Sequence, residues 1–230
     1  MWVGADYEIT DPGPIALSAP YTFFRPAPEE ISAIGPGDLI QATIRSNPPS
    51  LKWDAERLWF TVLSVSDDQF EARLESEPYD MPSFPKGRII EVPRQAIVGL
   101  VFADERPRIP EPRQYWERCF VDGSVLEGTR RIAYLYREDP ETSTGDTFPD
   151  SGWRVRASTA GQSALEAEKE TVQYVALGAV LNKDDSWLRL LDSPVGSSFR
   201  RDFETGIWIA EPFTPRVRGF RAFLTRLFSK

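Results

Sequence analysis

The chain has 230 residues, of which 41% are hydrophobic and 12% aromatic, so it is long enough for one large or two small domains and too apolar for general disorder. Its net charge of −8, from 35 acidic and 27 basic residues, argues against nucleic acid as a partner and favours a cationic protein. The absence of histidine excludes imidazole relays, and a single cysteine, Cys119, excludes internal disulfides and zinc sites built from thiolates.

Residues 1–30 are predicted to form an N-terminal arm, because closely spaced prolines in 11–14 and 25–28 deny the segment a helix. The first ten residues contain no basic segment followed by an apolar core, as a secretion signal would require. No apolar run in the chain reaches the ~18 residues that span a membrane. We therefore expect a cytoplasmic protein without membrane attachment.

Residues 31–105 are predicted to form a small β-rich domain. A polar break at 66–69 separates two stretches of alternating apolar residues and is typical of a hairpin. Five short strands within ~70 residues indicate a small twisted sheet or a partly open barrel. The predicted strands are residues 38–44, 57–65, 70–74, 89–92 and 96–102.

The segment 106–113 is predicted to be a linker between two domains. It contains three prolines and alternating charges, a composition that gives a stiff, extended connector. The chain is therefore expected to be α+β overall, with a β-rich domain before this linker and an α+β domain after it.

Residues 114–214 are predicted to form that second domain, with a mainly antiparallel sheet. The segment 162–181 mixes helical spacing with β-branched residues, and a helix is expected in its first half. The predicted strands are residues 117–121, 131–137, 152–157 and 206–210.

The last residues, 215–230, are predicted to form a basic amphipathic helix, because Phe220, Phe223, Leu224, Leu227 and Phe228 recur at helical spacing opposite arginines. Such a helix can lie on an anionic membrane or dock on a partner. Packing against its own acidic protein is the preferred interpretation, and no function is assigned to it.

Motifs for catalysis and cofactors are missing from the sequence. No G-x-G-x-x-G follows a predicted strand, and no G-x-x-x-x-G-K-[ST] is present, so no cofactor is predicted. No metal site is predicted either. Catalysis by paired carboxylates is the one remaining possibility. Glu138 and Asp150 are the pair that a hydrolase would need to bring together in one cleft. The chain is therefore expected not to be an enzyme.

Four short stretches in the second half carry a resemblance to a known family. Their order and approximate spacing fit the bacterial immunity protein family thirty-three, whose members occur beside polymorphic and contact-delivered toxins. The resemblance covers about residues 117–200, roughly a third of the chain. The stretches are residues 119–121 (CFV), 134–138 (YLYRE), 150–154 (DSGWR) and 190–199 (LLDSPVGSSF).

The chain also departs from that pattern. Similar proteins carry a glycine and acidic residues soon after the S-G-W-R stretch. In this chain residues 157–161 are neutral, and the acidic residues occur only at 166–170. The β-rich domain resembles a small bacterial β domain that accompanies such modules, through residues 37–38 (GD), 56–60 (ERLWF) and 75–78 (ESEP). No activity follows from that second resemblance.

The resemblance implies an immunity protein that binds a cognate secreted toxin, an effector of interbacterial competition, and neutralises it in the cytoplasm by occluding its active site. The acidic surplus predicts a basic toxin, and the oligomeric state stays open. The candidate contact residues lie where motif strands end and loops follow. They are Tyr136, Arg137, Glu138, Asp150, Trp153 and Arg154.

The same residues also have an architectural interpretation, which the patterns favour. Gly152 can supply a turn conformation that other residues avoid, Trp153 can fill a core, and Asp150 can pair with Arg154. An alternative function is a regulatory module that binds a small molecule or peptide without catalysis. In that case the aromatic side chains of Trp53, Trp59 and Phe60 would form the wall of the pocket.

Overall fold

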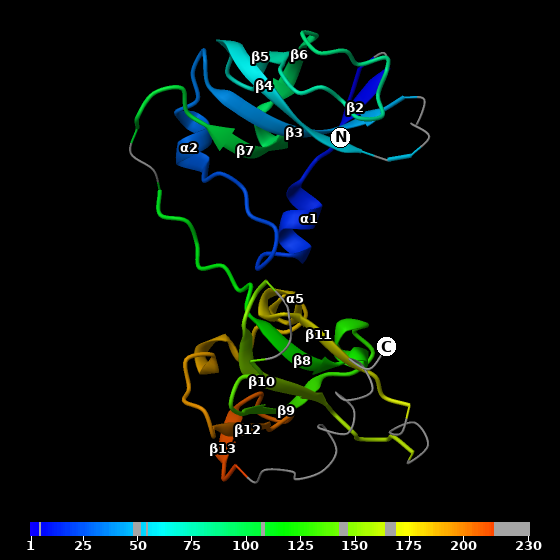
Figure 1. Ribbon diagram of the computed structural model, residues 1–230, viewed down its shortest axis with the longest axis vertical. Coiled ribbons are helices and arrows are strands. Elements are labelled where there is room, and N and C mark those ends of the chain that lie inside the picture. The colour runs from blue at the N-terminus through cyan, green and yellow to red at the C-terminus, as the bar shows by residue number, and fades with distance from the viewer. Residues whose placement is uncertain are drawn as a thin grey trace. The chain divides into compact units, whose positions relative to one another are not determined.

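The computed structural model describes residues 1–4, 6–47, 52–53, 55–106, 109–142, 147–163 and 169–213. It divides the chain into unit 1, Met1–Arg113, and unit 2, Gln114–Lys230. Each unit is built around one β-sheet, and the described helices are short (Figure 1). The two units are therefore mostly β, with less helix than the predicted α+β class implies. The helix predicted at residues 215–230 lies outside the described residues.

None of the helices among the described residues is long and apolar enough to span a membrane.

Unit 1 contains a seven-stranded sheet that curls into a nearly closed barrel. Its order is β1-β2-β3-β4-β5-β6, and β7 pairs with the first half of β3, on the side where β2 pairs with the second half. The 3-10 turn η1 (Arg94–Ala96) joins β6 to β7. The strands are β1 (Trp2–Val3), β2 (Tyr7–Ile9), β3 (Leu39–Ser46), β4 (Glu56–Val65), β5 (Gln69–Leu74), β6 (Ile89–Pro93) and β7 (Ile97–Val101).

The segment 1–30, predicted as an arm, contributes to this sheet. Strands β1 and β2 extend it, and the short helices α1 (Gly13–Ser18) and α2 (Pro28–Ser32) follow. The two strands are too short for an alternating pattern to show in the sequence. Burial of Ile9 and the ion pair between Asp6 and Arg88 hold them through contacts distant in the chain.

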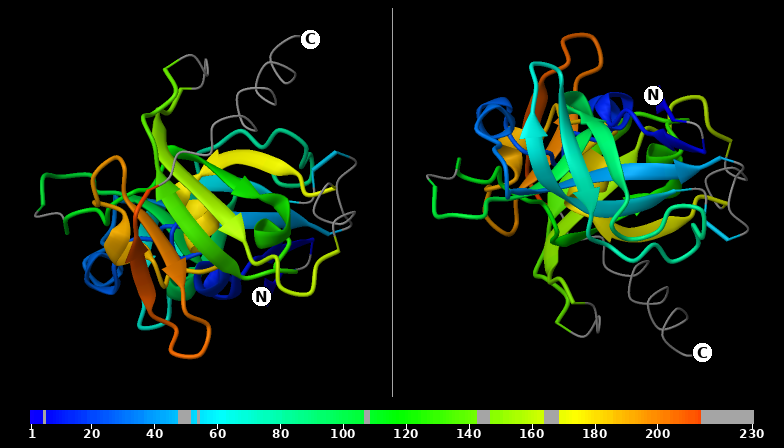
Figure 2. Two further views of the ribbon diagram at one scale, coloured as in Figure 1. Left: turned by 90° about the horizontal axis from the view of Figure 1, so that it is seen from below. Right: turned by 90° about the horizontal axis from the view of Figure 1, so that it is seen from above.

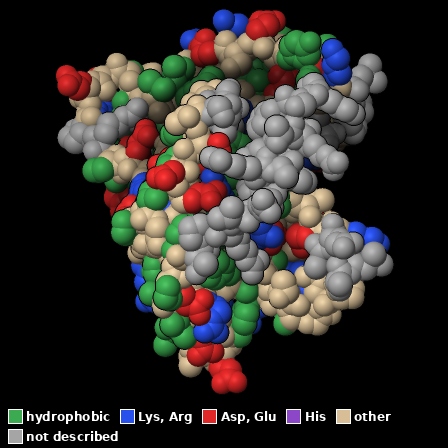
Figure 3. All heavy atoms as spheres, turned by 60° about the horizontal axis from the view of Figure 1, so that its bottom comes forward, with side chains coloured by type: hydrophobic (Ala, Val, Ile, Leu, Met, Phe, Trp, Pro, Cys, Tyr) green, Lys and Arg blue, Asp and Glu red, His purple; other side chains and the backbone are tan. Residues whose placement is uncertain are grey.

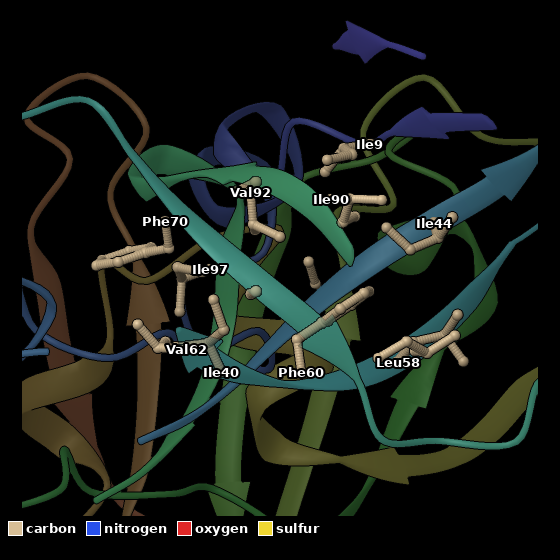
Figure 4. Close-up of a cluster of buried hydrophobic side chains, with 14 of the residues drawn as sticks. Ile9, Ile40, Ile44, Leu58, Phe60, Val62, Phe70, Ile90, Val92 and Ile97 are labelled. Carbon is tan, nitrogen blue, oxygen red and sulfur yellow. The ribbon is translucent and has the colours of Figure 1, made fainter. Parts of the chain in front are cut away.

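The core of unit 1 lies inside the curled sheet, as Figure 4 shows. Strict alternation along β3 and β4 sends every second side chain inward, which is why these strands were predictable. Phe60 is one of these inward residues and has no exposed surface, so it cannot serve as the wall of a pocket. The labelled side chains of the core are Ile9, Ile40, Ile44, Leu58, Phe60, Val62, Phe70, Ile90, Val92 and Ile97.

Unit 2 contains a six-stranded sheet with the order β11-β8-β10-β9-β12-β13. Only β8 and β10 run parallel, and the other neighbours are antiparallel. The strands are β8 (Arg118–Asp122), β9 (Ile132–Arg137), β10 (Asp150–Ala157), β11 (Val172–Ala176), β12 (Ser198–Arg201) and β13 (Trp208–Glu211).

Strands β8 and β11 each lead directly into a short helix, α3 (Gly123–Leu126) and α5 (Leu177–Leu181). The segment 162–181 therefore contains a strand and a helix in its second half. Half of the segment in which a helix was predicted, residues 164–168, lies outside the described residues, and residues 162–163 and 169–171 are not helical. The β-branched Val172 and Val175 favour the strand that precedes α5.

The core of unit 2 contains two indoles packed edge to face. Trp153 of β10 and Trp187, just before the 3-10 turn η2 (Leu188–Leu190), are fully buried with ring centroids 5.6 Å apart, edge to face. The Trp153 indole N–H donates to the Leu191 carbonyl at 3.2 Å. This bond joins the sheet to the segment that follows η2.

Cys119 of β8 lies in the same core, and its burial predicts that the thiol is chemically inert. Burial raises its pKa from 9.0 to about 12. We expect no alkylation by iodoacetamide in the folded protein at pH 8, and full alkylation in urea, measured by mass spectrometry. Because the unfolded thiol ionises above pH 9 and the folded one does not, its contribution to stability is lost as pH rises from 9 towards 12. Rapid labelling of the native protein would contradict this burial.

Candidate functional site: the open face of the unit 2 sheet

The two faces of the unit 2 sheet differ in what lies against them. Successive side chains of a strand point to opposite faces, so Trp153 and Val155 of β10 face the core while Arg154 and Arg156 face the other way. We call this second surface the open face, after the side that α3 and α5 leave uncovered; Arg154 is buried on it, and Arg156 is partly exposed. In the left panel of Figure 2, neither α3 nor α5 lies in front of it.

Strand register arranges the open face in two rows that cross all six strands. The first row is Tyr174, Phe120, Arg154, Tyr136, Ser198 and Glu211. The second row is Val172, Asp122, Arg156, Tyr134, Arg200 and Ile209. Tyrosine and arginine are thus neighbours at the centre of both rows.

A buried ion network lies in the first row. Arg154, whose side chain is 1% exposed, donates two hydrogen bonds to Asp150 at 2.9 and 2.8 Å and a third to Glu138. Its guanidinium also lies 4.6 Å from the centre of the Phe120 ring. Burial lowers the pKa of Arg154, but hydrogen bonds and charge from Asp150 outweigh burial, and the net shift is upward. The network holds Arg154 charged and fixed.

A second ion pair lies in the next row. Asp122 is 4% exposed and accepts hydrogen bonds from Arg156 and from the backbone N–H of Ala157. Burial raises the pKa of Asp122, and the charge of Arg156 opposes this shift. Arg156 keeps 37% of its side chain exposed, so it presents a positive group at the surface while anchored below.

The tyrosines of the open face pack against other rings. Tyr134 and Tyr136 lie 5.8 Å apart between centroids, and Tyr136 stacks on Phe213 at 5.8 Å. Phe120 and Tyr174 lie 4.6 Å apart at the other side of Arg154. Burial and the charge of Glu138 raise the pKa of Tyr136. The three tyrosine rings are half-buried, and their neighbours hold them in place in the absence of a partner.

The structure distributes the predicted contact residues between the core and the open face. Trp153 and Arg154 are buried, and Asp150 is engaged by Arg154. Arg137 donates to the backbone carbonyls of Ser151, Leu191 and Ser193. Their observed contacts are architectural. Tyr136 and Glu138 are half-buried on the open face, and partner contact stays a prediction for them.

None of the six residues of the second row was among the predicted contact residues, including Tyr134, Arg156, Arg200 and Ile209. Their signal is alternation, since each lies two positions from a first-row residue on the same strand. Alternation shows which side chains share a face of one strand, but the strand order is needed to show that they form one surface.

The structure shows the surroundings of the residues named for the hydrolase and for the small-molecule pocket. Glu138 and Asp150 both bind the guanidinium of Arg154, so each carboxylate already has a cationic partner. In unit 1, a shallow depression of about 340 Å³ is lined by Trp53, Tyr79 and neighbours, without Trp59 or Phe60. Over the described ranges, no group of acidic or cysteine side chains has the geometry of a metal site.

The net charge is concentrated in unit 1. That unit has 18 acidic and 11 basic residues, a net −7, whereas unit 2 has 17 and 16, a net −1. On the molecular face shown in Figure 3, acidic and basic side chains lie interspersed among apolar ones. Along the two rows of the open face, three arginines outnumber the carboxylates of Asp122 and Glu211, so the rows themselves lack the acidic surplus from which a basic partner was predicted.

Comparison with known proteins adds one finding. Residues 119–211 match the family described as Immunity protein Imm33 domain. The matched range begins in β8 and ends with β13, so it contains the whole sheet and both rows of the open face. No curated protein and no solved structure matches the chain.

Proposed function

We propose that this chain binds a cognate toxin in the cytoplasm and neutralises it by covering its active site, because residues 119–211, in the sheet of unit 2, match the Immunity protein Imm33 domain family. The observation that carries the proposal is the pair of tyrosine- and arginine-rich rows on the open face of that domain. The chain acts in this proposal as an inhibitor and needs no reactive group.

The composition of the open face supports protein binding. Tyrosine and arginine are enriched among the residues that contribute most to protein interfaces. Tyr134 and Arg156 are adjacent in the second row and partly exposed, and Arg156 is held in place by Asp122. Side chains already fixed in their bound conformation lose little entropy on association. These two residues form the centre of the proposed contact.

The charge distribution assigns different tasks to the two units. With a net −7, unit 1 attracts a basic toxin over distance and accelerates the encounter. Unit 2 then makes the close contact through the rings and paired charges of the open face. Association should therefore slow as salt is raised, while dissociation changes little.

Co-expression with the toxin encoded beside its gene tests the proposal directly. We expect growth to be restored and the two proteins to co-elute on size exclusion. A toxin that still kills, together with separate elution of the two proteins, would rule the proposal out.

We predict that Tyr134→Ala weakens toxin binding by at least ~2 kcal/mol, about 30-fold, because a central ring of the interface is lost. The matched control is Tyr79→Ala, which removes an exposed ring of unit 1 and should leave the dissociation constant unchanged. Titration calorimetry measures both. If Tyr79→Ala weakened binding and Tyr134→Ala did not, the contact would lie on unit 1 instead.

A further inference from the structure

We infer that β13 is an open edge at which a second copy of this chain pairs, so that two unit 2 sheets join into one continuous sheet. Among the described residues, β13 ends the strand order and pairs only with β12. This inference concerns self-association and does not depend on the toxin.

The backbone of β13 has hydrogen-bonding groups that the sheet leaves unused. Asp202 donates its N–H to the carbonyl of Ile207, which marks these two as a hydrogen-bonded pair. In an antiparallel ladder such pairs recur at every second residue, so Ile209 and Glu211 also turn their backbone groups towards β12. Trp208 and Ala210 therefore direct theirs outward, away from the sheet.

The side chains of this edge are apolar where natural edges are usually protected. Ile207 is 54% exposed and Ile209 is 44% exposed. Proteins commonly protect an edge strand with charged residues or proline. Residues 207–210 contain neither, and the charge of Glu211 and the proline at 212 lie at the end of the strand. Exposed isoleucines beside unused backbone groups favour pairing with another strand.

The sequence of the edge is complementary to itself in an antiparallel arrangement. With a twofold axis at Ile209, that residue faces its own copy, and Trp208 bonds to Ala210 of the second chain. Ile209 then lies in a non-hydrogen-bonded pair, where opposed side chains are closest. Glu211 faces Ile207, so no two like charges are opposed. This is the isologous contact that a twofold dimer requires.

The two residues described after β13, 212 and 213, lead away from this edge. Phe213 stacks on Tyr136 of β9, two strands inward from β13. Phe213 therefore lies over the open face. A pairing of four residues is small beside the ~800 Å² per partner of stable complexes, so we expect a weak, concentration-dependent dimer.

Amide exchange of the full chain, measured by NMR at low and high protein concentration, tests the inference residue by residue. We expect exchange at Trp208 and Ala210 to slow several-fold on concentration, while Ile209, already bonded to β12, stays unchanged. Sedimentation velocity should show a dimer over the same range. A monomer at every concentration, with unchanged exchange at Trp208 and Ala210, would overturn the inference.

A pair of variants at one exposed position isolates the backbone contribution. Ala210→Pro removes an outward N–H without breaking a bond to β12, and it should abolish the dimer. Ala210→Val keeps that N–H and has a higher strand propensity, so its dimer should persist. Equal dimerisation of both variants would also overturn the inference. If Ala210→Pro failed to fold, the exchange experiment on the unaltered chain would still decide.

Discussion

Replacing Arg154 with leucine is expected to lower the free energy of unfolding of unit 2 by about 3–5 kcal/mol. The change leaves Asp150, whose side chain has no exposed surface, without its cationic partner. A buried carboxylate without a counter-charge destabilises the fold, because the loss of its hydration is not compensated by an ion pair. Asp150 keeps hydrogen bonds from the backbone of Glu141 and Gly152, which places the loss towards the lower end of this range.

Arg200→Leu is the matched control for that variant. It makes the same chemical change on the same face of the sheet, but Arg200 is 60% exposed and pairs with Glu211 at the surface. An exposed pair contributes ~0–1 kcal/mol, so this variant should unfold almost as the unaltered chain does. Urea denaturation followed by tryptophan fluorescence measures both. Equal losses for the two variants would show that Arg154 is not held by buried charge.

The strands of unit 1 were predictable because their physical signal is local. Residues 38–44 and 57–65 alternate between apolar and polar, and the structure places β3 and β4 there with every second residue buried. Strands β1 and β2 were missed because three residues carry no readable period. Their pairing depends on β3, more than thirty residues away in the chain.

The candidate site was only partly predictable for a related reason. The strand predicted at residues 152–157 is confirmed, although β10 begins two residues earlier, at Asp150. Whether Arg154 faces solvent or an ion network depends on its neighbours. Its neighbour β8 is joined to it by a parallel pairing across more than twenty-five residues of chain. No local sequence pattern indicates such a pairing. That Tyr134 and Arg156 lie side by side on one surface is therefore evident only from the structure.

Gly152→Ala is the second change with a large expected effect, a loss of about 3–5 kcal/mol from the free energy of unfolding. Gly152 has a φ of +80°, which costs a residue with a side chain ~1–2 kcal/mol. A Cβ there would also lie 2.2 Å from the backbone carbonyl oxygen of Glu138. Because Glu138 donates its own N–H to the Gly152 carbonyl, the backbone cannot retreat without breaking that bond.

Gly196→Ala separates the two causes of that loss. Gly196 has a φ of +88°, but a Cβ there would meet no atom within 4 Å, so it bears the conformational cost alone. The difference between the two variants in thermal or urea unfolding therefore measures the clash with Glu138. If both lost the same ~1–2 kcal/mol, β9 and β10 would be able to separate at Glu138, and the carboxylate of that residue could not be fixed beside Arg154 as the open face requires.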